Sequence, residues 1–425
     1  MSGASPMALA LTLSAFWRAS ARAKRLRTRD QLLKWQSARL ERFLRNTAPK
    51  VAAFSGIASH RLTDYPVMDK DALMSGFHRY NVPGITADAG WQALETSHRI
   101  GHYSVGASTG TSGNRGLYLV SDAERYLWLG TLLAKALPDM LSARYRVALM
   151  LPRSSRLYDA ANESGRLALK FFDLADGLDI QLPAVANFRP NVIVAPPHAL
   201  LALARADLAL APQHVFSGAE VLDPADRGEI EARFGLGVRE IYMATEGLFG
   251  AACTHGRLHL CEDCVAFEWE PSGDLSAPLV TDFTRRTQMM VRYRMNDLLQ
   301  LSEEPCACGS PLQAVTAVAG RQDDTFQLKG EGSQAVRITP DVIRNAVVSA
   351  SRLIKDFRVV QSGPDAVSLI LPPQLAAELP AAERALQDLF ARHGARPQIN
   401  AGTAPLLPPQ SGKLRRVIRS PGIAP

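Results

Sequence analysis

The chain has 425 residues, of which 47% are hydrophobic and 21% charged, and its net charge at pH 7 is +7. That length is about two to three times a typical domain, so the chain can bury a sizeable core, and one large domain with a smaller one is expected. All five cysteines lie between Cys253 and Cys308, which excludes the disulfide framework of a small secreted scaffold and favours a reducing, cytoplasmic location.

The N-terminal region predicts a surface helix and no membrane segment. The opening MSGASPMALALTLSAFWRAS contains an apolar run that is too short to span a bilayer and has no positive segment before it, so we expect neither a signal peptide nor a transmembrane anchor. Between Arg18 and Asn46, apolar residues recur at roughly helical spacing: Leu32, Leu33, Leu40, Phe43 and Leu44. This pattern indicates one apolar stripe and a basic face. The basic face is either solvated or in contact with an anionic membrane, nucleic acid or acidic carrier protein.

Residues 103–120, YSVGASTGTSGNRGLYLV, consist of two runs of high strand propensity joined by a segment rich in Gly, Ser and Thr. Small residues let successive backbone N–H groups point into one concavity, and hydroxyl groups add donors for phosphate oxygens. The segment therefore indicates either a nucleotide phosphate site or an ordinary turn between strands. It lacks the Gly-Lys-Ser/Thr ending of a Walker-type loop, which disfavours that class of kinase or ATPase.

From about residue 140, strand-like runs alternate with helical ones. We expect strands at 146–151, 191–197, 214–218 and 238–247, and helices at 164–177, 199–210 and 225–235. This alternation is typical of an α/β domain with parallel strands, whose ligands bind beyond the carboxyl ends of the strands. The charged, glycine-bearing segment 320–332 predicts a hinge, and the runs after it predict a compact α+β domain of about one hundred residues.

Six segments in this order resemble motifs of the adenylate-forming superfamily of acyl-CoA and aryl-CoA ligases, in particular its phenylacetate-CoA ligase and coenzyme F390 synthetase branch. They are STGTSGNRG (108–116), FSGAE (216–220), IYMATEG (241–247), RYRMNDLL (292–299), GRQDD (320–324) and PPQSGKLRR (408–416). The likeness covers roughly residues 60–420. It implies an α/β fold with a large layered adenylation domain, residues 1–321, and a small mobile α+β domain, residues 322–425, that carries a catalytic lysine.

The resemblance also implies an ATP site. The phosphate loop would hold the pyrophosphate part of ATP through Ser108, Thr109, Gly110, Thr111, Ser112 and Gly113. Thr245 would contact the α-phosphate, and Glu246 would hold Mg²⁺, a hard cation that carboxylates suit. Lys413 would bridge the oxygens of the carboxylate substrate and the α-phosphate as charge shifts between them.

On the adenosine side, the resemblance implies contacts from Gly218, Ala219, Glu220, Tyr242, Asp297 and Arg321. Tyr242 would stack on adenine beside the backbone of residues 218–220, Asp297 would accept hydrogen bonds from the ribose hydroxyls, and Arg321 would support the ribose. The sequence departs from the family pattern directly before Asp297, where Met-Asn at 295–296 replaces Thr-Gly.

The reaction that the resemblance implies has two steps. A carboxylic acid and MgATP give an acyl-adenylate and pyrophosphate, and a thiol then displaces AMP. The acid is expected to be aromatic, and the thiol is either coenzyme A or a carrier protein; the sequence is compatible with a monomer and with a homodimer. The tail domain would rotate about Asp323 between the steps, because one cavity cannot host the groups of both reactions at once.

Two alternatives remain open. One is transfer of the adenylyl group to a cofactor, as in the F390 branch, so that AMP stays on the product. The other is a catalytically inactive, zinc-stapled basic protein that binds nucleic acid or another partner, which the net charge and the cysteine cluster would suit. The lysine motif at 411–413 favours the ligase, for which no nucleic acid partner is expected.

The cysteines offer two possible zinc sites. From spacing alone, a Cys-x-x-Cys and a Cys-x-Cys pair could bind tetrahedral zinc through Cys261, Cys264, Cys306 and Cys308. The resemblance instead favours Cys253, His259, Cys306 and Cys308, because some relatives place a structural zinc on a Cys, a Leu-His and a Cys-x-Cys-Gly turn. Thiols without metal are the third interpretation. Four protein ligands leave no open position, so a zinc ion held by either set would be structural.

Overall fold

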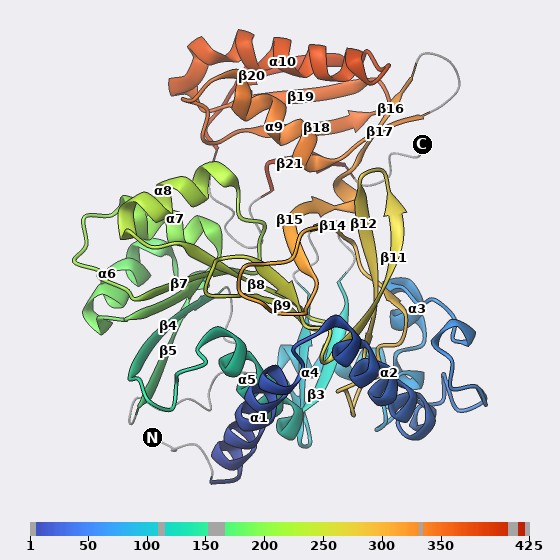
Figure 1. The fold of residues 1–425 in the computed structure, drawn as a ribbon. Helices are drawn as coiled ribbons and strands as arrows, with labels where there is room; N and C mark the ends of the chain where they lie inside the picture. The colour runs from blue at the N-terminus through green and yellow to red at the C-terminus, as the bar shows by residue number, and fades with distance from the viewer. Residues whose placement is uncertain (1–5, 109–114, 152–165, 331–334, 407–414, 421–425) are drawn as a thin grey trace. The chain divides into compact units, whose positions relative to one another are not determined.

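The computed structural model describes residues 6–108, 115–151, 166–330, 335–406 and 415–420 (Figure 1). The chain forms two compact units. The first unit comprises residues 1–271, 276–295 and 301–316, and the second comprises residues 272–275, 296–300 and 317–425. Each unit has its own hydrophobic core.

The N-terminal region forms two helices, α1 (Pro6–Arg25) and α2 (Arg29–Asn46), where the sequence predicted one. The chain breaks because Thr28 caps α2: its hydroxyl accepts from the Gln31 N–H, and the Gln31 side chain accepts from the Thr28 N–H. The predicted apolar stripe is correct for Leu32 and Phe43, which are buried, whereas Leu33 is exposed. No helix in the described part of the chain is long and apolar enough to cross a membrane.

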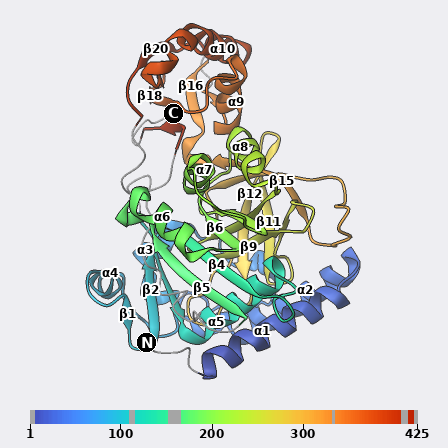
Figure 2. The same ribbon diagram turned by 90° about the vertical axis from the view of Figure 1, so that its left-hand side faces the viewer.

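Helix α1 packs against α5 (Asp122–Ala136), and both views show the two helices side by side (Figures 1 and 2). The close approach depends on Gly130, because a Cβ atom at this position would lie 2.1 Å from the Thr12 carbonyl oxygen. The apolar run near the N-terminus is thus a packing surface of the first unit.

Between α2 and α5, the chain forms α3 (Lys70–Ser75), α4 (Ala87–Glu95) and a three-stranded sheet of β1 (Arg99–Ile100), β2 (Tyr103–Ala107) and β3 (Leu117–Ser121). Strands β2 and β3 are antiparallel, with Ala107 opposite Leu117. This arrangement confirms the two predicted strands at the ends of residues 103–120. Gly106 is required in β2, because a Cβ atom there would lie 2.0 Å from the Tyr118 ring.

The centre of the first unit is a parallel sheet in the order β5-β4-β6-β7-β8. Its elements, in chain order, are β4 (Tyr145–Leu151), β5 (Leu167–Asp173), α6 (Leu178–Phe188), β6 (Val192–Ala195), α7 (Pro197–Arg205), β7 (His214–Gly218), α8 (Pro224–Phe234) and β8 (Val238–Ala244). On one face, Ala148 and Ile193 pack in the core formed with α6, α7 and α8. On the other face, Val147 and Val192 pack in the core formed with α1 and α5. The predicted layered α/β architecture is confirmed.

The helix predicted at 164–177 is wrong. Residues 167–173 form strand β5, which pairs with β4 along its whole length, and Ala168 and Phe172 point into the core. The helix begins only at Leu178, after Gly177, whose φ of 96° is a conformation that glycine adopts without strain. A short apolar run such as LALKFF fits either secondary structure, and the neighbouring strand β4 decides between them.

The sheet continues with antiparallel strands β9 (Gly247–Ala252) and β10 (Leu258–Leu260), and β10 pairs with the first residues of β15 (Ala314–Arg321). The other strands of this region are β11 (Val265–Ser272), β12 (Leu275–Asp282), β13 (Tyr293–Arg294) and β14 (Asp297–Leu301). Strand β13 pairs antiparallel with β12. The boundary between the two units falls within β14 and β15.

The second unit has the α+β composition that the sequence predicted. It contains β16 (Phe326–Lys329), β17 (Ala335–Ile338), α9 (Pro340–Ala350), β18 (Arg358–Gly363), β19 (Ala366–Leu371), α10 (Leu379–Arg392), β20 (Gln398–Thr403) and β21 (Val417–Arg419). Strands β16 and β17 form a hairpin, and the other four strands form a sheet in the order β20-β19-β18-β21. Its core includes Ile343 of α9 and Leu386 of α10, which pack with Val359 and Leu369 of the sheet.

Candidate active site

Thr245 and Glu246 form the two-residue turn between β8 and β9, where Ala244 pairs with Gly247. The Thr245 hydroxyl donates to one oxygen of the Glu246 carboxylate at 2.8 Å, and the Tyr293 hydroxyl donates to the other at 3.1 Å. The turn lies at the carboxyl end of β8, which is where parallel α/β sheets bind their ligands. Two hydroxyl donors thus fix the orientation of the carboxylate expected to hold Mg²⁺.

Burial and the nearby Glu246 carboxylate raise the pKa of Tyr293 well above its usual range. Tyr293 therefore stays protonated at physiological pH and remains a donor to Glu246. The sequence analysis did not single out this residue, although it lies within the RYRMNDLL motif.

Arg285 supports the same turn from the protein interior. Its side chain is 1% exposed, and its guanidinium group donates to the main-chain carbonyls of Thr245 and Glu246. It also lies 4.9 Å from the centre of the Trp128 ring, and the Asp282 carboxylate lies 3.7 Å away. A buried arginine is retained only where such partners compensate its charge. Arg285 is a positioning residue that sequence reasoning missed, since nothing in its local pattern separates it from a surface arginine.

The glycine segment 218–220 begins at the carboxyl end of β7, the strand next to β8. Gly218 ends β7 and is paired with Ile241 of the adjacent strand β8, which also carries Tyr242. Ala219 has a φ of 67°, the left-handed region that favours glycine, and the Glu220 carboxylate lies 3.0 Å from His198 Nδ1. The structure therefore brings two of the predicted segments together at the carboxyl ends of neighbouring parallel strands.

Tyr242 is buried, and its ring centre lies 5.5 Å from that of Phe249. Its predicted stacking on adenine stays a prediction.

The phosphate loop is described only at its base. Ser108 N–H donates to the Gly116 carbonyl, and the Gly116 N–H donates to the Ser108 hydroxyl, both at 2.8 Å. These two bonds close the loop across the ends of β2 and β3. Residues Thr109, Gly110, Thr111, Ser112 and Gly113 lie outside the described residues, and so does Lys413.

Asp297 and Arg321 belong to the second unit, in which Arg321 Nε lies 4.0 Å from the Asp297 carboxylate. The neighbouring residue Asn296 donates from its side-chain amide to the Asp323 carboxylate at 2.6 Å. The second unit therefore gathers the two residues predicted to contact ribose and the predicted hinge residue. The predicted contacts with ribose stay predictions.

An apolar cavity of about 140 Å³ lies in the first unit between α5 and the parallel sheet. Every described residue that lines it is apolar, and the lining includes Phe216, Gly218, Ala219 and Met243. The cavity is therefore continuous with the glycine segment and with the strand that leads to Thr245.

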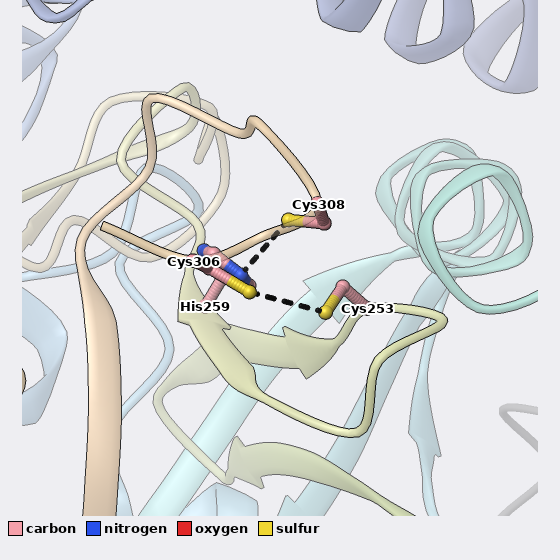
Figure 3. A group of neighbouring side chains, drawn as sticks. All are labelled: Cys253, His259, Cys306 and Cys308. Carbon is pink, nitrogen blue, oxygen red and sulfur yellow. Dashed lines mark hydrogen bonds between the residues drawn. The ribbon is translucent and has the colours of Figure 1, made fainter. Parts of the chain in front are cut away.

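Four of the predicted zinc ligands converge in the first unit (Figure 3). The candidate ligand atoms of Cys253, His259, Cys306 and Cys308 all lie within 4.8 Å of one another. Cys253 Sγ lies 3.8 Å from Cys306 Sγ, and Cys308 Sγ lies 3.4 Å from His259 Nε2. His259 Nδ1 lies 2.9 Å from the Leu312 carbonyl, which leaves Nε2 facing the thiols. Three soft sulfur atoms and one imidazole nitrogen fit tetrahedral zinc.

The alternative set, with Cys261 and Cys264, is not brought together among the described residues. Both thiols are buried, and burial raises the pKa of Cys261 to about 12 and that of Cys264 further. Their turn instead anchors the N-terminal helices through the two acidic residues between them. Glu262 pairs with Arg29 of α2, and Asp263 pairs with Arg22 of α1 at 2.7 Å.

No family model matches the chain. Among curated proteins, the phenylacetate-coenzyme A ligase of Thermus thermophilus is 24% identical over 201 residues, which are 42% of this chain and 44% of the relative. Protein CapK of Staphylococcus aureus is 28% identical over 153 residues, or 33% of this chain and 34% of the relative. The matched region thus spans less than half the length of these relatives.

Solved structures match over more of the chain. 2-Hydroxyisobutyryl-CoA ligase in its postadenylation state, in complex with 2-HIB-AMP, has a TM-score of 0.66 and 18% identity, with 92% of this chain and 89% of that chain covered. The anthranilate CoA ligase AuaEII in complex with anthranoyl-AMP has a TM-score of 0.51 and 16% identity, with 74% and 66% covered.

Proposed function

Because this chain has the fold of the adenylate-forming acyl-CoA ligases, we propose that it activates a carboxylic acid with ATP and transfers the acyl group to a thiol. In the first step, a carboxylate oxygen of the acid attacks the α-phosphorus of ATP, and pyrophosphate leaves. In the second step, the thiol sulfur attacks the acyl carbon of the adenylate, and AMP leaves. Likeness of fold alone does not assign an activity, so the proposal rests on the site.

The observation that carries the proposal is the position of the Thr245–Glu246 turn at the carboxyl end of β8, whose neighbour in the sheet, β7, leads into the glycine segment 218–220. The Thr245 hydroxyl can donate to an α-phosphate oxygen, and the Glu246 carboxylate, already oriented by Tyr293, can hold Mg²⁺. A bound Mg²⁺ would neutralise phosphate charge as the anionic acid approaches. The phosphate loop and Lys413 would supply further positive charge, as the sequence motifs indicate.

The apolar cavity supports an acid with an uncharged acyl group. Its lining of aliphatic side chains and Phe216 offers no partner for a polar substituent, so burying one there would cost free energy. Its lining includes Gly218 and Met243, which belong to two of the segments proposed to form the adenylate site. We propose that it receives the aromatic ring of an aryl acid.

Coenzyme A is the proposed thiol, with a carrier protein as the alternative. Support comes from the 2-hydroxyisobutyryl-CoA ligase, which was solved in complex with 2-HIB-AMP and CoA with a TM-score of 0.52 to this chain and 18% identity. Mass spectrometry of the product distinguishes thioester formation from adenylyl transfer to a cofactor, because only the adenylylated cofactor keeps AMP.

The test is ATP–pyrophosphate exchange with a panel of single carboxylic acids. We expect exchange with unsubstituted aryl acids and weaker exchange with acids that carry a charged or strongly polar acyl substituent. Glu246→Gln should abolish exchange, whereas Glu229→Gln, which removes a surface carboxylate on α8, should retain it. A panel of aryl and aliphatic acids with no exchange at all would refute adenylation.

For the cysteine cluster, we propose a structural zinc ion bound by Cys253, His259, Cys306 and Cys308. It would tie the turn between β9 and β10 to the loop that precedes β15. Four protein ligands leave no position for substrate, so the ion would stabilise the first unit without taking part in the reaction.

A further inference from the structure

A second and larger cavity lies in the first unit, among α1, α2, α5 and residues 282–286, with a volume of about 580 Å³. None of the described residues of the proposed ATP site lines it. Its lining includes six cationic side chains: Arg18, Arg22, Arg39, Arg42, Lys50 and Arg286. The cavity is therefore distinct from the apolar one beside β7 and is rich in positive charge.

The three carboxylates in its lining already have partners. Asp263 pairs with Arg22 at 2.7 Å and with Lys135 at 2.8 Å. Asp282 lies 3.7 Å from Arg285, and Arg285 is not one of the residues that line the cavity. Glu124 accepts the backbone N–H groups of residues 286 and 287 at 2.7 and 3.0 Å. These acidic groups are thus engaged within the protein.

Most of the cations, by contrast, form no ion pair with a carboxylate in the described part of the chain. Among the described residues, no carboxylate oxygen lies within 4.0 Å of the charged groups of Arg18, Arg39, Arg42, Lys50 and Arg286. The guanidinium group of Arg286 donates only to the main-chain carbonyls of Phe283 and Arg285. All five residues are exposed, so a ligand can reach them from solvent.

The guanidinium groups are close enough to repel one another. Burial lowers the pKa of Arg39, and the positive charges of Arg22 and Arg42 lower it further. Partial burial lowers the pKa of Arg286, the Asp282 and Glu124 carboxylates raise it, and Arg42 lowers it. Repulsion between like charges is relieved when an anion binds among them.

The walls of the cavity indicate what kind of anion fits. Guanidinium groups match the oxygens of phosphate in a planar, bidentate geometry. Beside them, Phe43, Trp128 and Phe283 offer aromatic and apolar surface. The volume is in the range of small-molecule sites, about 300–1,000 Å³.

We propose that this cavity binds a small phosphorylated organic molecule, with its phosphate among Arg39, Arg42 and Arg286 and its organic part against Trp128 and Phe283. The site is separate from the proposed ATP site. Its charge and volume suit one phosphate ester, and none of its described lining residues has a role in the proposed reaction.

Calorimetric titration of the full chain with phenyl phosphate tests the proposal, with phenol as the uncharged comparison. We expect one site for phenyl phosphate and none for phenol. Arg39→Gln combined with Arg42→Gln should weaken binding by about tenfold or more, because two charge-assisted hydrogen bonds are lost. The matched control, Lys34→Gln with Arg45→Gln, removes two exposed cations of α2 that do not line the cavity and should change binding less than about twofold.

If both double variants bound phenyl phosphate equally weakly, general charge attraction would explain the binding, and the proposal would be overturned. Glu246→Gln combined with Thr245→Ala should leave phenyl phosphate binding unchanged, and loss of binding there would place the probe in the ATP site instead. A second measurement uses the unaltered chain, so it does not depend on whether the variants fold. Phenylglyoxal modifies accessible arginines. Bound phenyl phosphate should protect Arg39 and Arg42 from this modification but not Arg45. Absence of that protection would also refute the site.

Discussion

Asn296 and Asp323 exchange two hydrogen bonds in the second unit: the Asn296 amide donates to the Asp323 carboxylate at 2.6 Å, and the Asp323 N–H donates to Asn296 Oδ1 at 3.1 Å. The Gln322 N–H also donates to the Asn296 carbonyl at 2.7 Å. Asn296 stands where the family pattern has a glycine, which could make neither side-chain bond. The proposed hinge residue is thus tied to the segment that carries Asp297.

Replacing Asn296 by alanine removes both side-chain bonds and should make the segment 320–332 easier to open. A loss of about 1 kcal/mol corresponds to roughly a fivefold higher open population. The rate of limited proteolysis within this segment measures the open population. Asn400→Ala, which changes an exposed asparagine of β20, is the control, and equal cleavage rates in the two variants would contradict the hinge contact.

Tyr293→Phe should lower the rate of ATP–pyrophosphate exchange by about tenfold and raise the Mg²⁺ concentration that half-saturates it, because Glu246 loses one of its two hydroxyl donors. Thermal unfolding should change little. Tyr80→Phe removes a hydroxyl that makes no hydrogen bond among the described residues and should behave as the unaltered protein. An unchanged Mg²⁺ requirement in Tyr293→Phe would argue against the proposed role of Glu246.

Lys413→Ala should reduce pyrophosphate exchange on the order of a hundredfold, because it removes the cation expected to bridge the acid and the α-phosphate in the transition state. Retained exchange with the preferred acid would reject the role that the C-terminal motif assigns to this residue. Lys329→Ala, on β16 of the same unit, controls for the loss of one surface charge.

The protein should contain one zinc ion per chain, measurable by metal analysis after dialysis. Cys306→Ser combined with Cys308→Ser should lose the metal and lower the midpoint of thermal unfolding, and a strong chelator should do the same to the unaltered chain. Cys264→Ala should keep the metal, since its thiol does not belong to the cluster. If Cys264→Ala lost the zinc ion, the other ligand set would be indicated. If the double variant kept it, the proposed cluster would not be the zinc site.

Asp263 should make stability depend on pH. Burial alone would raise the pKa of this carboxyl, but Lys135 and Arg22 together hold it well below its usual range. A lowered folded-state pKa contributes stability that is present above the unfolded value, about 3.9, and is lost as pH falls below it. Asp263→Asn should lower the free energy of unfolding at pH 7 by about 3–5 kcal/mol, because two cations lose their partner.

Denaturant unfolding between pH 7 and pH 3 checks the prediction for Asp263. The difference between the unaltered chain and Asp263→Asn should shrink toward pH 3. Asp30→Asn, which removes an exposed carboxylate from the first turn of α2, should shift stability by less than about 1 kcal/mol. A difference that does not change with pH would indicate that packing, not charge, explains the effect.

The sequence alone determined the features that depend on local pattern. Alternating apolar runs were sufficient for the α/β class, and the two runs of high strand propensity within residues 103–120 were sufficient for the β2–β3 pair. The motif around Thr245 and Glu246 was found through its resemblance to a family motif, and the structure then showed that the two residues form the turn between β8 and β9. The local pattern predicted the wrong secondary structure for residues 167–173. Their apolar run fits either a helix or a strand, and the pairing with β4 decides for the strand.

Only the tertiary structure decided between the two cysteine sets. Spacing along the chain suggested Cys261 and Cys264, and the family resemblance suggested Cys253 and His259, as partners of Cys306 and Cys308. The β9–β10 hairpin places His259 beside the Cys306–Cys308 turn, whereas Cys261 and Cys264 face the N-terminal helices. Only the tertiary structure revealed that Arg285 contacts the main chain at Glu246, and that α1, α2 and residue 286 contribute cations to one cavity. These contacts join residues far apart in sequence, so they follow from how the elements pack and not from any periodicity within one element.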